Sequence, residues 1–344
     1  MAETVGRYLN TVGGQAKAAP LLKERNRMSN TIELAADVPS ECRGQRFDQV
    51  AALLFPDYSR ERLKEWIKAG QLTVNGASGK PKDKLLGGEA LALQAELANE
   101  ATWEAEDIAL DIVFEDEHLL VVNKPAGLVV HPAAGNYSGT LVNALLHHNP
   151  DQAQLPRAGI VHRLDKETTG LMVVAKTLAA HHNLVSQLQA RSVSREYEAV
   201  AVGQFTGGGK VDAPIGRHPK QRKLMAVVPI SGKEAVTHYR VLDRFAHHAH
   251  LRLKLETGRT HQIRVHMAHI NHPLVGDPVY GGRFRKPQGA SAALLETLRE
   301  FPRQALHAAS LGLVHPHSNE LMSWQAPLPD DMVQLLAALE ADSD

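Results

Sequence analysis

The spacing of apolar residues changes along the chain, and each change indicates a helix or a strand. Apolar residues recur at helical spacing over residues 47–54, and a second helix that begins after Ser59 carries Leu63, Trp66 and Ile67 on one face. A glycine then ends this helix. The sequence that follows, QLTVNG, is typical of a strand that runs into an Asn-Gly turn. This segment therefore has the pattern of a small module of two helices and short strands.

Farther along the chain, short apolar strands are mixed with amphipathic helices. Alternation at period two predicts half-buried strands, and apolar positions three and four residues apart predict helices. We expect strands at 118–123, 171–176, 195–202 and 250–256, and helices at 139–147, 177–191, 260–270 and 330–339. In one of these helices, Leu178, Val185 and Leu188 are expected to face inward. Because neither a repeat nor a strand–helix–strand periodicity is evident, we predict an α+β fold with a mixed or antiparallel sheet.

Length and composition limit the class of protein. A chain of 344 residues suggests two domains, and no apolar run approaches the roughly 20 residues needed to cross a bilayer, so we expect no membrane partner. The single cysteine, Cys42, excludes an internal disulfide framework and a Cys-rich zinc site. Because the N-terminus lacks an apolar signal core, we expect a cytoplasmic protein. Residues 1–40 are expected to form a disordered leader, and we hypothesise that translation starts at Met28 rather than Met1.

Charge is balanced overall but segregated along the chain. The 38 Lys and Arg residues equal the 38 Asp and Glu residues in number, which argues against a uniformly basic nucleic-acid binder. Residues 41–84 nevertheless hold nine basic and six acidic residues, whereas residues 100–117 hold eight acidic residues and no basic one. We therefore predict a basic module over 41–95, an acidic linker over 96–107 and a large domain over 108–344.

Basic side chains of the small module are suited to contact a phosphate backbone. The candidates lie on the second helix and after the turn: Arg60, Arg62, Lys64, Lys68, Lys80 and Lys82. A charge run on a helix is more often only a solvated face, and that alternative stays open. The module resembles the α-L RNA-binding domain of the S-four ribosomal-protein type in three consecutive segments, RFDQVAALLF, SRERLKEWIKAGQLTVNG and KPKDKL.

The segment GIVHRLDKETTGLMVVAK, at residues 159–176, is the first candidate for chemistry. Two apolar strands flank a polar stretch that begins at Asp165. A carboxylate at the junction of a strand and a loop is held rigidly, which suits a catalytic acid. An aspartate that only caps the turn before Thr168, Thr169 and Gly170 is an equally good explanation of this segment by itself.

Two further segments contain groups that suit a site with a carboxylate. In LETGRTHQIRVHMAHINH, at 255–272, Gly258 breaks a strand, Thr260 is placed to cap a helix, and Arg259 and Arg264 lie at its start. An arginine beside a buried carboxylate keeps it ionised, although a surface ion pair of little effect is the alternative. In SREYEA, Tyr197 suits stacking on a nucleobase, although a buried tyrosine is more often part of the core.

Cofactor and metal motifs are not found in the sequence. HRLD resembles a kinase catalytic loop, but no glycine-rich loop precedes it and no DFG follows it. The glycines at 207–209 are not followed by the Lys-Ser/Thr start of a helix that a phosphate loop needs. The 19 histidines form no HExxH arrangement. We therefore expect neither a cofactor nor a metal.

The motifs of the large domain together resemble those of the RluA family of RNA pseudouridine synthases. HRLDKETTGLMVVAK at 162–176 resembles the active-site motif of that family. The other matches follow in the family's order: VVNKPAGLVVHP, REYEAV, LETGRTHQIRVHMAHINHPLVGDPVYG and RQALHA. The resemblance covers nearly all of residues 108–340. It implies the pseudouridine synthase fold, with a mixed, largely antiparallel central sheet flanked by helices.

The resemblance also implies roles for individual residues. Asp165 is implied as the catalytic aspartate, Arg264 as its ion-pair partner, and Tyr197 as the ring that stacks on the target uracil and helps to remove the C5 proton. Three more sets follow from the motifs: Ile263 packing under the base, Arg163 filling the gap that the base leaves, and Asn123 and Lys124 supporting the active-site loop. Whether Asp165 abstracts a ribose proton or attacks covalently stays open, and the resemblance favours the elimination route.

The implied partner is 23S rRNA, at the helix 69 stem-loop, or a pre-50S ribosomal particle, and a monomer is the default expectation. The implied activity is the isomerisation of uridine to pseudouridine, with no cofactor. Two alternatives remain. The same chemistry on tRNA or on another 23S site is one, and a non-catalytic rRNA-binding assembly factor is the other. An acidic residue at the centre of an RNA-facing loop argues against the second, because it repels phosphate.

Overall fold

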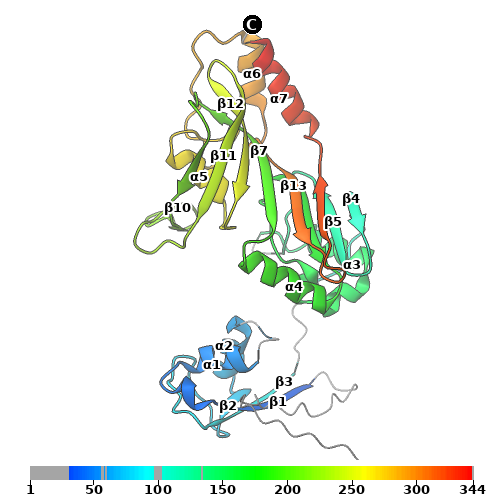
Figure 1. The fold of residues 1–344 in the computed structure, drawn as a ribbon, viewed down its shortest axis with the longest axis vertical. Coiled ribbons are helices and arrows are strands. Elements are labelled where there is room, and N and C mark those ends of the chain that lie inside the picture. The colour runs from blue at the N-terminus through cyan, green and yellow to red at the C-terminus, as the bar shows by residue number, and fades with distance from the viewer. Residues whose placement is uncertain (1–30, 56–57, 59, 97–102, 133–134, 343–344) are drawn as a thin grey trace, which may run out of the picture. The chain divides into compact units, whose positions relative to one another are not determined.

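A computed structural model describes residues 31–55, 58, 60–96, 103–132 and 135–342 of the chain (Figure 1). Contacts divide the chain into two compact units, 1–102 and 103–344, and each is described here by itself. Among the described residues, no helix is long and apolar enough to cross a membrane.

The small unit is a three-stranded antiparallel sheet with two helices. Its elements are β1 (Thr31–Asp37), a 3-10 turn (Ser40–Cys42), α1 (Phe47–Leu54), α2 (Arg60–Lys68), β2 (Leu72–Val74) and β3 (Ala90–Glu96). The strand order is β1-β3-β2. The predicted apolar face of α2 is confirmed, because Leu63, Trp66 and Ile67 are buried in the core of this unit. Asn75 and Gly76 both have positive φ, as the predicted turn requires.

The start of the small unit corrects the prediction of a disordered leader. Residues 31–37, which were assigned to that leader, form β1 and pair with β3 along its whole length, from Thr31 opposite Glu96 to Asp37 opposite Ala90. The backbone pairing with a strand some 55 residues later stabilises this segment, and the local sequence does not contain that information. The remainder of the leader, including Met28, lies outside the described residues.

The large unit is built on a nine-stranded sheet, counted over the described residues. Its strand order is β4-β5-β6-β13-β7-β12-β11-β8, with β14 paired to β13, and only the β6–β13 pair is parallel. The strands are β4 (Ile112–Glu115), β5 (Leu119–Lys124), β6 (Thr169–Ala175), β7 (Ser194–Val202), β8 (Gly209–Asp212), β11 (Val236–Arg244), β12 (His248–Leu255), β13 (Leu306–Val314) and β14 (Leu321–Gln325). The predicted mixed, largely antiparallel sheet is confirmed.

Helices cover both faces of this sheet (Figure 1). The helices are α3 (Leu141–His148), α4 (Leu178–Gln189), α5 (Gln262–His269), α6 (Ala292–Glu300) and α7 (Asp330–Ala341), and a separate hairpin joins β9 (Ile215–Arg217) to β10 (Met225–Val227). The largest apolar cluster joins α3 and α5 to one face, whereas α4 packs with a second cluster on the other face. Near one end of the sheet, α6 and α7 pack together around Val200 of β7.

Two details of the large unit differ from the prediction. In α4, Ala180 and Leu184 face the core, and Leu178 is exposed. The apolar stripe of this helix is weak, so the spacing of its residues did not determine which side faces the core, although the predicted Leu188 does pack against the second cluster. The linker is also shorter than predicted, because Trp103 packs against the large cluster and the carboxylate of Glu106 accepts hydrogen bonds from the backbone N–H of Gly139.

The face of β7 that is turned away from the large cluster carries a buried polar network. Glu198 accepts hydrogen bonds from the His250 ring, 2.9 Å away, and from the guanidinium of Arg252. The His250 ring is also 3.0 Å from a carboxylate oxygen of Asp243. Burial lowers the pKa of His250, but its hydrogen bonds to the two carboxylates outweigh burial and raise it. The hydrogen bond from His250 is the main reason that the pKa of Glu198 is lowered to about 2, against the opposing effect of burial.

Because of this network, the free energy of unfolding depends on pH in the acid range. A carboxyl group whose pKa falls on folding contributes stability above its unfolded pKa and loses that contribution as the pH falls through the folded pKa. Between pH 4.5 and pH 2, Glu198 is therefore expected to account for a loss on the order of 3 kcal/mol of unfolding free energy. Urea unfolding of the Glu198→Gln variant should show a smaller loss over that window than wild type. Glu196→Gln on the same strand is the control, and an identical acid dependence of wild type and Glu198→Gln would refute the assignment.

Candidate active site

Asp165 lies in the loop between the strand-like residue Ile160 and β6, and its side chain is mostly buried. An oxygen of its carboxylate is 2.9 Å from Nη1 of Arg264, which α5 carries. The other oxygen is 3.8 Å from Nε2 of His261. The ion pair between Asp165 and Arg264, which the resemblance implied, is thus present across 99 residues of sequence.

Arg264 is itself fixed by a second carboxylate. Asp277, whose side chain is fully buried, accepts hydrogen bonds from Nε and Nη2 of Arg264 at 2.8 and 2.9 Å. The guanidinium also lies over the ring of Tyr280, 5.1 Å from its centroid. With one edge, Nε and Nη2, held by Asp277 and one face covered by Tyr280, Arg264 presents Nη1 to Asp165. The remaining donor is therefore aimed at the carboxylate of Asp165.

His261 is the residue at which the chain turns into α5. It has left-handed backbone angles, with φ of 55°, and it precedes the first residue of the helix, so the predicted cap at Thr260 is wrong by one position. Its Nδ1 is 2.8 Å from the hydroxyl of Tyr280. Burial lowers the pKa of His261, and the nearby Asp165 opposes that effect. At neutral pH the imidazole is thus uncharged, and Arg264 is the cation that balances Asp165.

Side chains from distant parts of the chain hold the loop that carries Asp165. Each of four consecutive residues after Asp165 has its own partner, at 2.8 to 3.1 Å: Lys166 with Lys124, Glu167 with Arg303, Thr168 with Gln304, and Thr169 with His307. In the first two pairs the backbone carbonyl of the loop accepts the hydrogen bond. Because the loop is held at successive positions, Asp165 is fixed from β5 on one side of β6 and from β13 and the residues just before it on the other.

A close backbone approach ends this loop. Gly170 has φ of 110°, and a Cβ atom there would lie 2.3 Å from the carbonyl oxygen of Ala308. Glycine is therefore required for the loop to enter β6 beside β13. The parallel pairing of Gly170 with Ala308 connects the site to the centre of the sheet.

Arg303 links the loop to the C-terminal helix. It is fully buried, and its Nε and Nη2 each lie 2.7 Å from an oxygen of Asp331 in the first turn of α7. Its Nη1 donates to the carbonyl of Glu167. An arginine with two donors on a carboxylate cannot rotate, so the third donor has a fixed direction.

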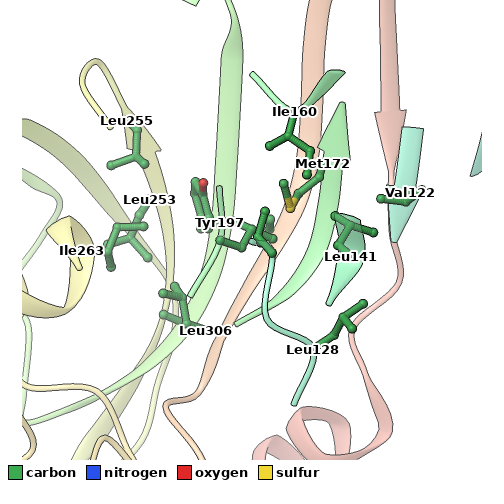
Figure 2. Close-up of a cluster of buried hydrophobic side chains, with 14 of the residues drawn as sticks. Val122, Leu128, Leu141, Ile160, Met172, Tyr197, Leu253, Leu255, Ile263 and Leu306 are labelled. Carbon is green, nitrogen blue, oxygen red and sulfur yellow. The ribbon is translucent and has the colours of Figure 1, made fainter. Parts of the chain in front are cut away.

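Tyr197 and Ile263 of α5 both belong to the large apolar cluster (Figure 2). Tyr197 is 5% exposed and Ile263 is 4% exposed. Burial raises the pKa of the phenol, and Asp165 is close enough to raise it further. The ring is thus a neutral, apolar surface near the carboxylate at neutral pH.

The other residues implied by the resemblance have different surroundings. Lys124 is 1% exposed, and its ammonium donates to the carbonyls of Pro125, Leu128 and Lys166; burial lowers its pKa to about 8. Asn123 donates to Asp111. Arg163 is exposed, and none of the described residues forms an ion pair with it.

The six basic residues of the small unit fall into two groups. Three are engaged within the unit: Arg60 with Asp48, Arg62 over the ring of Trp66, and Lys64 with Glu61. Lys68, Lys80 and Lys82 are exposed, and no described residue forms an ion pair with their side chains. The buried Asp48, which binds both Arg60 and Arg46, explains why the charge run on α2 is only partly available.

Several residues of the site were not identified from the sequence. Asp277, Tyr280 and Arg303 all lie within quoted motifs, but a role for them depends on contacts that only the fold creates. The strongest signal available was the short GDPVYG segment, in which an aspartate and an aromatic residue follow a glycine. Over the described part of the chain, no three His, Cys, Asp or Glu side chains are grouped so that they would hold a metal ion.

Comparisons with known proteins agree with this geometry. Residues 118–269 match the family model described as RNA pseudouridylate synthase. The chain is 64% identical over 317 residues to ribosomal large subunit pseudouridine synthase D of Pseudomonas aeruginosa, covering 92% of this chain and 99% of that protein. It is 60% identical over 316 residues to the protein of the same name from Escherichia coli K12, covering 92% of this chain and 97% of that protein.

A solved structure extends the comparison to the fold. Human RNA pseudouridylate synthase domain containing 4 is 30% identical, with a TM-score of 0.51, and the match covers 67% of this chain and 92% of that one. The matches to these two relatives cover 92% of this chain, and therefore span the segments that carry Asp165, Tyr197 and Arg264. The chain therefore belongs to the RluA family of RNA pseudouridine synthases, which are isomerases.

Proposed function

We propose that this protein isomerises uridine to pseudouridine in 23S rRNA, with Asp165 as the catalytic residue. The observation that carries the proposal is the Asp165–Arg264–Asp277 array beside Tyr197, in a chain that is 60–64% identical to proteins named ribosomal large subunit pseudouridine synthase D. We further propose the helix 69 stem-loop as the region that is modified, in rRNA or in a pre-50S particle.

The isomerisation requires a carboxylate beside the ribose and a surface that holds the detached base. The C1′–N1 bond of the uridine breaks, the uracil turns, C5 bonds to C1′, and the proton on C5 is lost while N1 gains one, so substrate and product are isomers. A base inside a helix must first be flipped into a pocket. Asp165, held by Arg264, provides a carboxylate beside the ribose. Tyr197 provides the ring on which the detached uracil stacks, an interaction worth about 1–3 kcal/mol for each base.

The remaining residues support these two groups. Ile263 extends the apolar surface under the base, and Arg163 is exposed and unpaired among the described residues, so it is available to fill the gap in the RNA stack. Lys124 holds the catalytic loop through a hydrogen bond to the carbonyl of Lys166, and Asn123 precedes it on β5. No step of this reaction needs a cofactor.

We propose that residues 41–95 act as an α-L RNA-binding domain, extended at the start by β1, and that residues 108–344 act as the catalytic domain together with the segment from Trp103 that packs onto it. The exposed lysines Lys68, Lys80 and Lys82 are the side chains best placed to contact phosphates, because none is committed to a described carboxylate. Arg60, Arg62 and Lys64 then serve mainly to stabilise the domain, with their outer atoms open to RNA.

Replacing Lys68, Lys80 and Lys82 together by glutamine tests this division. We expect KM for long rRNA to rise at least about tenfold with little change in kcat, because phosphate contacts supply affinity and no chemistry. The dependence of binding on salt should also become shallower. Lys64→Gln, which removes a lysine already paired with Glu61, is the control. Equal losses in kcat and KM for the triple variant would contradict a separate binding domain.

The release of tritium from 23S rRNA labelled with [5-³H]uridine tests the proposed activity directly, since the C5 proton is lost only when C5 bonds to C1′. We expect release by the wild-type protein without added nucleotide and in the presence of EDTA. Transcripts that contain only helix 69, or tRNA, separate the proposed target from other RNA. Release from tRNA alone would overturn the rRNA assignment, and no release from any RNA would overturn the activity.

A further inference from the structure

Arg195 is a buried cation without an anion. It lies on β7, two residues before Tyr197, and is 8% exposed. Its Nε is fully buried and has no hydrogen-bond partner. Over all the residues that the structure describes, no hydrogen bond or ion pair reaches its guanidinium. The equally buried Arg264 and Arg303 differ, because each binds an aspartate through two donors.

The alternation of β7 explains why no acidic residue of the same strand reaches Arg195. Side chains of successive strand residues point to opposite faces, so Glu196 and Glu198 lie on the face opposite to Arg195 and Tyr197. Glu198 is already bound to His250 and Arg252 on that face. Opposite Arg195 on the neighbouring strand β12, the register places an apolar residue, because Glu196 pairs with Lys254.

His162, a buried neighbour of Arg195, does not neutralise it either. Its Nε2 accepts a hydrogen bond from the backbone N–H of Val173 at 3.1 Å. Burial, with a smaller contribution from Arg195, lowers the pKa of His162 to about 3. His162 is therefore neutral at physiological pH and supplies no negative charge. The charge of Arg195 is close enough to His162 and Tyr197 to lower the pKa of each, and neither group carries a negative charge at neutral pH.

A glycine makes room for this arrangement. A Cβ atom on Gly258 would lie 2.7 Å from Nη1 of Arg195, so a side chain there would displace the end of this arginine. The φ of Gly258 is not in the left-handed region, so backbone strain does not require glycine here, and the end of Arg195 is what a side chain would meet. Gly258 opens the turn that leads through His261 into α5 and Arg264. The chain therefore keeps a close space around a charge that it leaves unpaired.

Leaving a largely buried charge without a counter-charge is energetically costly. A group that is kept in such a state is prepared for a charge that arrives with the substrate. We propose that Arg195 binds an anionic oxygen of the flipped uridine nucleotide beside Tyr197. Two sources offer that chemistry. One is a backbone phosphate at the target uridine. The other is a carbonyl oxygen of the uracil, which becomes negatively charged because the detached uracil keeps the electron pair of the C1′–N1 bond. The inference rests on the proposed function.

Stability and activity together test the inference, with Arg195→Met as the main variant and Arg195→Lys as the conservative one. Removing an unpaired buried charge should leave the melting temperature unchanged or raise it, while kcat/KM for rRNA falls at least about 100-fold. Arg195→Lys keeps the charge but lacks the several N–H donors of the planar guanidinium, so its kcat/KM should fall about tenfold. Arg303→Met, which breaks a buried pair, is the matched control and should lower the melting temperature. If Arg195→Met lowered the melting temperature by a similar amount, Arg195 would have a structural role and the inference would be overturned.

Salt dependence separates the two sources of the oxygen. RNA affinity is measured in an Asp165→Asn background, with and without Arg195→Met. A slope of log K against log salt that is shallower by about 0.7 identifies a phosphate. If the slope is unchanged but Arg195→Met slows the single-turnover rate of the protein that retains Asp165, the oxygen belongs to the uracil. If neither the slope nor the rate changes, the inference is overturned. If the wild type releases tritium and Arg195→Met does so at the same rate, the inference alone fails; if the wild type releases none, the proposed function fails with it.

Discussion

Replacing Asp165 by asparagine is expected to lower kcat by at least about 10⁴-fold, while the affinity for RNA stays the same or improves. Asparagine has nearly the same shape but cannot carry the negative charge or accept a proton. It also still accepts a hydrogen bond from Nη1 of Arg264, so the loop should keep its position. Removing a negative charge beside an RNA backbone weakens electrostatic repulsion, which explains the expected affinity. Tritium release and filter binding on the same transcript measure the two quantities.

The same loop offers a matched control. Glu167 lies two residues from Asp165, and its backbone carbonyl, not its side chain, makes the contact with Arg303. Glu167→Gln removes one negative charge from the same loop and should change kcat by less than about threefold. If Glu167→Gln lost as much activity as Asp165→Asn, the general charge of the loop would explain the result. If Asp165→Asn kept most of its activity, the assignment of the catalytic residue would be wrong.

Replacing Arg264 by methionine is expected to affect both stability and activity. The variant leaves Asp277 buried, with no cation to pair with it, and breaking a buried pair in this way costs about 3–5 kcal/mol. At present, burial raises the pKa of Asp277, and the hydrogen bonds and charge of Arg264 outweigh burial and lower it. Without Arg264, Asp277 should take up a proton more readily, so the variant should be least stable at high pH. Asp165 also loses its counter-charge, and tritium release should fall at least about 100-fold.

A second substitution separates the two effects of losing Arg264. Asp277→Asn in the Arg264→Met background removes the orphaned charge and should restore part of the lost unfolding free energy, while activity stays low. Urea unfolding at pH 6 and pH 9, followed by circular dichroism, gives the stabilities. A double variant that is no more stable than Arg264→Met would contradict the view that Asp277 is a charge held by this arginine. Full activity in Arg264→Met would contradict its role beside Asp165.

Patterns that are local in sequence predicted local structure well. The apolar face of α2, the turn at Asn75 and Gly76, and the closing helix α7 follow from spacing and from residues with particular backbone preferences. β1 and the rotation of α4 were missed for a related reason. Both depend on what they pack against, and neither an edge strand of mixed residues nor a helix with a weak apolar stripe specifies its partner.

The site could be predicted only in part from the sequence. The contact between Asp165 and Arg264 followed from a family resemblance, since the residues are 99 positions apart and no local pattern connects them. Asp277 and Arg303 were missed because a buried aspartate and a buried arginine look like surface charges until the fold shows their partners. Arg195 is the converse case: only the structure shows that it has no partner.

The contact from Arg303 to Glu167 has a consequence for the order in which the protein matures. A ribosome releases residues 165–170 long before residue 303, and residue 331 is later still. The carbonyl of Glu167 gains its anchor only after Arg303 and Asp331 have left the exit tunnel and α7 has folded back onto the sheet. We therefore expect nascent chains to hold an incomplete site, so that a finished enzyme, rather than a chain still being translated, modifies RNA.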